Sequence, residues 1–125
     1  MNRREFIGTG GTIALVASPS RALAQRGRAW LDRAVPGVGL TVSGSPRELR
    51  LYFTMGVVTA FSGVQITSST GAPIPASRLV NDPSDQQIVI VRFKRALSRG
   101  TYTVSWHMIS AYGRPSWGRF QFTVT

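Results

Sequence analysis

Residues 97–124 read LSRGTYTVSWHMISAYGRPSWGRFQFTV and contain the clearest structural pattern in the chain. Polar and apolar side chains alternate over Thr101–Met108 and again over Arg119–Val124. Because successive side chains of a strand point to opposite faces, this alternation places one row in a core and the other in water. The two runs therefore predict strands.

The same period of two recurs upstream. It covers residues 49–54 and 64–67, whereas Ile88–Phe93 is apolar on both faces, which suits a central strand. Turn-forming residues separate these runs at 43–46, 69–73, 81–85 and 98–100. Residues 26–34 could be tried as a helix, but Pro36 and the glycines at 37 and 39 would stop it. The pattern predicts an all-β domain, either a sandwich or a barrel.

Tyr102 follows Gly100 by two residues and begins an apolar strand. This arrangement resembles the tyrosine corner of immunoglobulin-like sandwiches, in which the phenol bonds back to nearby backbone. The alternative is a core aromatic without that hydrogen bond, and we favour the corner.

The first 24 residues have the features of an export signal. Arg3 and Arg4 precede a short apolar stretch, and Ala22-Leu23-Ala24 is a small-x-small cleavage site. This start resembles the twin-arginine signal, with an ordinary secretory signal as the alternative. The stretch is shorter than the about 20 apolar residues of a permanent span. We expect cleavage after Ala24, a periplasmic product, and one domain over residues 25–125 without a membrane span.

The chain is strongly basic, with 15 Lys and Arg against 5 Asp and Glu and a net charge of +10. After loss of residues 1–24 the net charge would be about +8. An exported basic domain suits an anionic membrane surface, an acidic protein or an acidic glycan. No basic run is dense enough for a nucleic-acid arm. With no cysteine, the fold must depend on its core.

Catalytic patterns are not found. His107 is the only histidine, and no serine or carboxylate stands at a spacing that would complete a triad with it. Residues 25–125 contain four acids, two of them in the turn-forming segment 81–85. We therefore predict that the protein is not an enzyme.

Three blocks of the chain are similar to the CopC copper-resistance family. They are Arg28–Pro36, Ser45–Thr54 and Leu97–Val124. In the third block nine residues fall in step with the family pattern, namely Gly100, Tyr102, Val104, Trp106, Ser110, Gly118, Phe120, Phe122 and Val124. The resemblance implies an immunoglobulin-like or cupredoxin-like Greek-key β-sandwich of about seven strands. It also implies a periplasmic copper carrier whose partner is a membrane copper transporter or another periplasmic protein.

The resemblance implies three Cu(II) ligands: a histidine at the mature N-terminus, an aspartate and a second histidine. Their positions here hold Arg28, Tyr112 and Arg114. A guanidinium offers no lone pair, and a tyrosine would have to ionise far below its usual pKa near 10. The methionine-rich Cu(I) loop of some members is also missing. Copper is thus a cofactor of the family, no metal ligand is assigned here, and we predict that the site is lost.

An alternative function follows from the residues that replace the site. Arg28 and Arg114 would flank Tyr112, with Trp30 and Trp117 nearby. Arginine binds carboxylates and phosphates through two parallel hydrogen bonds, and aromatic residues beside arginines mark protein hot spots. These five residues predict a module that binds an anionic ligand or an acidic partner protein. The alternative is a structural domain in which the arginines only fill and solvate the vacated site.

Overall fold

The computed structural model describes residues 27–125, so the predicted export signal and its cleavage site lie outside the described residues. The described chain forms eight strands and one short 3-10 turn, η3 (Thr59–Phe61). The strands are β1 (Leu31–Val35), β2 (Thr41–Val42), β3 (Glu48–Phe53), β4 (Gly63–Ser68), β5 (Val80–Asp82), β6 (Asp85–Arg92), β7 (Gly100–Ile109) and β8 (Pro115–Val124). No helix within residues 27–125 has the length and apolar character needed to cross a membrane.

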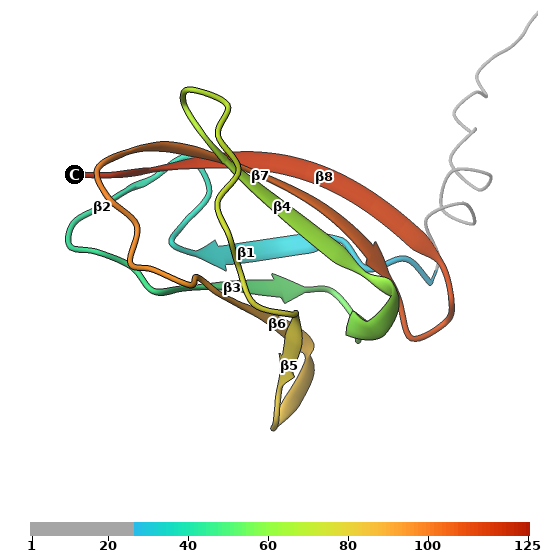
Figure 1. Cartoon of the computed structure of the whole chain (residues 1–125). Helices are drawn as coiled ribbons and strands as arrows, with labels where there is room; N and C mark the ends of the chain where they lie inside the picture. Colours follow the sequence, from blue (N-terminus) through green and yellow to red (C-terminus); the bar gives the residue numbers. More distant parts are fainter. Residues whose placement is uncertain (1–26) are drawn as a thin grey trace, which may run out of the picture.

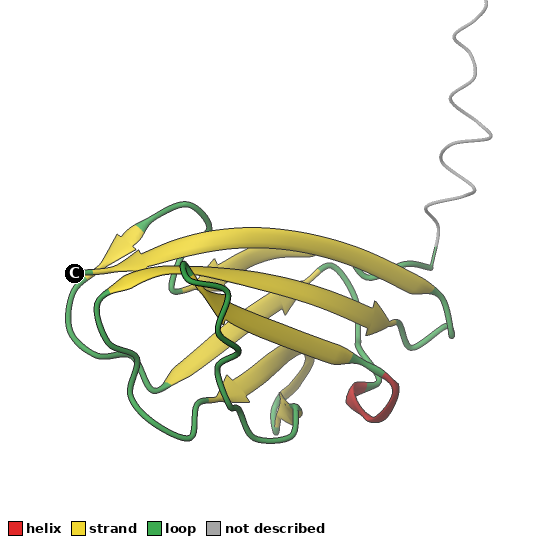
Figure 2. Cartoon of the chain, turned by 45° about the horizontal axis from the view of Figure 1, so that its top comes forward, coloured by secondary structure: helices red, strands yellow, loops and turns green. Residues whose placement is uncertain are grey.

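The strands form two four-stranded sheets (Figures 1 and 2). The first sheet has the order β1-β3-β6-β5, with antiparallel neighbours throughout. The second has the order β2-β8-β7-β4, in which only the β2–β8 pair is parallel. The chain crosses between the sheets five times, since each of the connections from β1 to β5 changes sheet and the chain crosses once more between β6 and β7. The predicted all-β sandwich is confirmed.

One hydrophobic core lies between the sheets. The row Tyr102, Val104, Trp106 and Met108 of β7 is buried, and so are alternate residues of β3 and β8. These side chains belong to a single cluster with Val89 and Val91 of β6. Ile90 is also buried, as expected for an interior strand that is apolar on both faces. The predicted inward and outward rows are therefore confirmed.

The tyrosine corner is confirmed as well. The phenol of Tyr102 donates a hydrogen bond of 2.8 Å to the carbonyl oxygen of Ser98. Its ring stacks on Phe122, with 5.6 Å between the ring centroids. The corner therefore ties the start of β7 to the preceding loop.

The alternation pattern did not reveal β1, β2 and β5. β2 and β5 have two and three residues, too few to show a period. In β1 the pairing with β3 shifts between Leu31 and Arg33, which interrupts the inward and outward alternation. As expected from Pro36 and the glycines at 37 and 39, residues 27–34 form no helix; irregular chain over 27–30 leads into β1.

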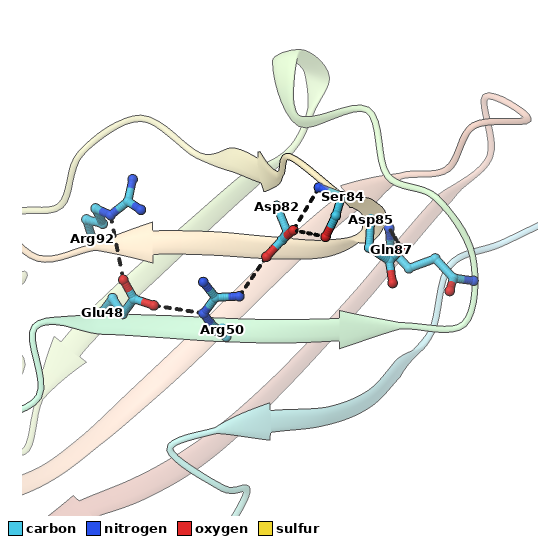
Figure 3. A network of polar contacts seen from close by, with 7 residues as sticks. All are labelled: Glu48, Arg50, Asp82, Ser84, Asp85, Gln87 and Arg92. Atoms are coloured by element: carbon cyan, nitrogen blue, oxygen red, sulfur yellow. Dashed lines mark hydrogen bonds and ion pairs between the residues drawn. The ribbon is translucent and has the colours of Figure 1, made fainter.

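A polar network covers the outer face of the first sheet (Figure 3). Arg50 of β3 contacts Glu48 at 2.8 Å and Asp82 at 2.9 Å, and Arg92 of β6 reaches Glu48 at 3.6 Å. The pKa of Asp82 is lowered to about 2. The largest causes are hydrogen bonds from the hydroxyl and the backbone amide of Ser84, followed by the hydrogen bond from the Arg50 guanidinium. Hydrogen bonds to Asp82 and then Glu48 raise the pKa of Arg50 above its usual value. The network ties β5 and β6 to β3.

Candidate functional site at the turn between β7 and β8

The turn between β7 and β8 is closed by its own backbone. The amide of Ser110 donates to the carbonyl of Arg114 at 2.9 Å, and the amide of Gly113 donates to the carbonyl of Ser110 at 2.8 Å. Gly113 has φ of +78°, a conformation that glycine adopts without steric cost. Tyr112 and Arg114 on either side of Gly113 are exposed.

The buried hydroxyl of Ser110 joins this turn to the start of the described chain. It donates to the carbonyl of Gly27 and accepts hydrogen bonds of 3.2 Å from the amides of Tyr112 and Arg114. A Cβ placed on Gly27 would lie 3.4 Å from Cγ of Arg114 and 3.5 Å from Cβ of Tyr112. The backbone of Gly27 therefore lies against both side chains. The described chain begins beside the turn between β7 and β8 (Figure 1).

Two further bonds hold the following residues along the start of β8. Nη1 of Arg28 donates to the carbonyl of Pro115, and the buried hydroxyl of Ser116 donates to the carbonyl of Ala29. Positions 28, 112 and 114 are thus brought to one end of the sandwich, although 84 residues separate the first from the second in sequence. Two buried serines, Ser110 and Ser116, bond across this end to the backbone of Gly27 and Ala29.

The two tryptophans of the predicted set lie in different surroundings. Trp30, 37% exposed, packs edge-on against Trp106, with 6.4 Å between the ring centroids. Trp117, 61% exposed, lies beside His107 on the outer face of the second sheet, with 5.7 Å between centroids. Trp30 therefore covers the end of the core, whereas Trp117 belongs to a separate surface.

Groups suited to metal binding do not gather in the described part of the chain. Within residues 27–125, no three His, Asp or Glu side chains lie close enough to hold a metal ion. His107 points to the outer face of β7, opposite Trp117, and not toward the turn. The side chains at the turn are two arginines and a tyrosine, which supply positive charge and hydrogen-bond donors.

Charge is distributed unequally between the two sheets. Each strand of the first sheet carries one acid, and these are the only acids in residues 27–125: Asp32, Glu48, Asp82 and Asp85. The second sheet and the turn between β7 and β8 contain no acid, and their charged residues are Arg114 and Arg119. With Arg28, the end of the molecule at this turn is cationic.

Sequence reasoning did not assign roles to Ser110 and Ser116. Ser110 was part of the family pattern, and its place between an apolar strand and a Gly-Arg-Pro turn was the available signal. Ser116 carried no comparable signal, because a serine at the start of a strand is commonly exposed. Both are fully buried, and both bond to backbone of residues 27–29.

Comparison with known proteins identifies the relatives of this arrangement. The model of the CopC domain family matches residues 31–125, which include all eight strands. Protein YobA of Escherichia coli K12 is 34% identical over 96 residues, covering 77% of each chain. Copper resistance protein C of Escherichia coli is 28% identical over 122 residues, covering 93% of this chain and 92% of its own.

A solved structure has the same fold. The crystal structure of PcoC, a methionine-rich copper resistance protein from Escherichia coli, matches with a TM-score of 0.72 and 25% identity. The match covers 78% of this chain and 99% of PcoC. In contrast to a methionine-rich protein, residues 27–125 contain two methionines, Met55 and Met108.

Proposed function

This chain belongs to the CopC family, and on that premise we propose that it is a periplasmic copper-resistance protein that does not hold Cu(II) at the family's site. The family match and the relatives named for copper resistance support the role at the level of the family. The predicted signal over residues 1–24 supports export. A carrier or adaptor role requires no catalytic group.

The observation that carries the proposal is the chemistry at the turn between β7 and β8. The three positions that the family resemblance links to Cu(II) lie together there and hold Arg28, Tyr112 and Arg114. Two guanidinium groups repel a divalent cation, and neither provides a lone pair. Cu(II) favours nitrogen and oxygen donors in a tetragonal arrangement, which these side chains do not supply.

A Cu(II) titration of the mature protein tests the proposal. We expect no visible d–d band and no saturable quenching of tryptophan fluorescence. A variant with Arg28→His, Tyr112→Asp and Arg114→His, whose N-terminus is reset to position 28, should gain one-to-one binding. Tight one-to-one binding by the unchanged protein would contradict the proposal. Failure of both proteins to bind would count against a metal-carrying ancestry for this site.

A second function is supported by the distribution of charge. Arg28 and Arg114 lie with the exposed Tyr112 at an end of the sandwich whose sheet and turn contain no acid. We propose that this end contacts an anionic ligand or an acidic partner, such as a membrane copper transporter or another periplasmic protein. The partner would then provide the copper ligands. A salt-sensitive pull-down that is lost with Arg114→Gln but kept with Arg99→Gln would support this function.

A further inference from the structure

The outer face of the second sheet is divided into two halves by its cross-strand pairs. At one end, the two polar side chains of each cross-strand pair are hydrogen-bonded to each other. Thr101 and Thr123 are joined at 2.9 Å, and Nε2 of Gln121 donates to the hydroxyl of Thr103 at 3.1 Å. These side chains are satisfied within the sheet, so this half of the face has few polar groups left for a ligand.

The other half carries an aromatic pair followed by a polar pair. His107 and Trp117 are opposite each other on β7 and β8, and their ring planes are tilted by 31°. Ser105 and Arg119 form the next outward pair along the same strands. The more exposed ring is Trp117, so an apolar surface lies beside a hydroxyl and a guanidinium.

Strand β4 adds a third residue to each of these two cross-strand pairs, and the three strands together form a groove. Gly63 pairs with His107 and has open space where a side chain would stand, whereas Gln65 pairs with Ser105. The resulting groove has a volume of about 580 Å³, and we call it the His107–Trp117 groove. Its outward-facing lining residues are Gly63, Gln65, Ser105, His107, Trp117 and Arg119. This volume is within the roughly 300–1,000 Å³ of small-ligand sites, and the groove is shallow and open to solvent.

We propose that the His107–Trp117 groove binds a short acidic oligosaccharide. A sugar ring has one face of C–H groups, which can stack on an exposed indole, and a rim of hydroxyls, which suits an amide and a hydroxyl. Gln65 and Ser105 form the polar row that would meet this rim. The site is distinct from the turn that holds Arg28 and Arg114, and the inference does not depend on the copper-related function.

An acidic sugar is favoured over a neutral one by charge. Arg119 is the single charged residue among those that line the groove, and the second sheet contains no acid that would compete for it. A guanidinium pairs with a carboxylate through two parallel hydrogen bonds. The carboxylate of a uronic acid would therefore be held by Arg119 while its ring lies on Trp117.

A protein partner fits this groove less well. Protein hot spots are centred on an aromatic or arginine anchor enclosed by contacts that exclude water. Here the rows that continue the groove along the sheet are Ser105 with Arg119 and then Thr103 with Gln121, which are polar. Along β7 and β8 in the other direction, the next outward pair is apolar, Ile109 with Pro115. The polar border on one side of the groove suits a hydroxylated ligand.

The test is a titration of the purified protein, labelled with ¹⁵N, with trigalacturonate, an oligomer of a uronic acid. We expect chemical-shift changes at the indole of Trp117 and at the backbone of 63–65, 105–107 and 117–119. Neutral maltotriose should bind at least about tenfold more weakly. Trp117→Ala and Arg119→Gln should each reduce affinity for trigalacturonate by about tenfold, and the Arg119 variant should lose most of the salt dependence.

Matched variants outside the groove serve as controls. Phe61→Ala removes an aromatic that is 71% exposed, and Arg99→Gln removes an exposed positive charge. Both should leave affinity for trigalacturonate unchanged. The proposal is overturned if saccharides cause no shifts at millimolar concentration, or if the shifts map to residues 110–114. It is also overturned if a poly-glutamate peptide binds the groove as tightly as trigalacturonate.

Discussion

Ser110 is the residue through which the two distant parts of the candidate site are held together. Ser110 is fully buried at the edge of the core. Its hydroxyl makes hydrogen bonds with three backbone groups: the carbonyl of Gly27 and the amides of Tyr112 and Arg114. A single side chain thus orders the turn between β7 and β8 and fixes the start of the described chain beside it.

Replacing Ser110 with alanine should therefore be costly. The change removes a fully buried hydroxyl that bonds to a carbonyl and two amides, and the loss of such a buried partner costs about 1–3 kcal/mol. We expect the free energy of unfolding, measured by urea denaturation, to fall by about that amount. Ser105→Ala, on the outward row of β7, should change it by less than about 0.5 kcal/mol. Equal effects of the two changes would show that the Ser110 bonds contribute nothing.

Gly118 of β8 pairs with Trp106 of β7, and the Trp106 ring leaves no room for a side chain at position 118. A Cβ at position 118 would lie 2.2 to 2.6 Å from three atoms of that indole. The indole is held by Phe53 and Trp30, whose rings meet it edge-on, so it cannot move aside easily. The close approach of backbone and ring explains a glycine in the middle of β8.

Gly118→Ala should accordingly destabilise the protein by about 1–3 kcal/mol, the usual cost of overpacking a core. Gly63→Ala is the matched control, because a Cβ there meets nothing within 4 Å. Thermal unfolding followed by circular dichroism would separate them. A lower melting temperature for the Gly63 variant than for the Gly118 variant would contradict this account of the contact.

At the scale of elements, a backbone ladder holds β6 to β3, and a charged network adds side-chain links from β3 to β5 and β6. β5 has three residues, and its outer face depends on the bonds that Asp82 makes with Ser84 and Arg50 (Figure 3). These contacts are partly exposed, so each contributes little at neutral pH in salt. Their effect becomes visible when the carboxylate takes up a proton.

The ionisation of Asp82 makes the free energy of unfolding depend on pH in a definite direction. The pKa of Asp82 is about 2 in the folded protein and 3.8 ordinarily, so folding favours its ionised form. Its contribution is complete above pH 3.8 and is lost as the pH falls toward 2. We expect urea denaturation to show stability decreasing over this window, with a shallower decrease in Asp82→Asn. Asp32→Asn, at an exposed position of β1, should keep the slope of the original protein; if it flattens the slope equally, the decrease does not come from Asp82.

At the scale of the whole molecule, one core joins the two sheets. Buried residues of β1, β3 and β6 form a single cluster with those of β4, β7 and β8. The chain has no cysteine, so this cluster is held without disulfides. The two sheets differ instead in charge, with the four acids of residues 27–125 confined to the first sheet.

A single core without cross-links should unfold in one step. We expect tryptophan fluorescence and far-ultraviolet circular dichroism to give the same urea midpoint, and a thiol reductant to leave that midpoint unchanged. Trp106 and Trp30 report on the interface between the sheets, whereas circular dichroism reports on all strands. Two separated midpoints would mean that the sheets unfold independently.

Much of the fold could be read from residue order alone. Alternation over 49–54, 101–108 and 119–124 identified strands and their inward rows, because the side-chain period of a strand is a local property. The same residues suggested the corner at Tyr102. β1, β2 and β5 could not be found in this way, since they are short or carry a bulge, and pairing with a neighbour is what makes them strands.

The candidate site shows the same division. Its residue types at 28, 112 and 114 were evident from the sequence, and so was their positive charge, since a guanidinium stays charged wherever it lies. Their proximity, the roles of Ser110 and Ser116, and the separation of Trp117 from Trp30 arise from hydrogen bonds and strand register between residues distant in sequence. Such long-range contacts form only when the sheets pack, because closing the intervening chain costs entropy that the packed core must offset.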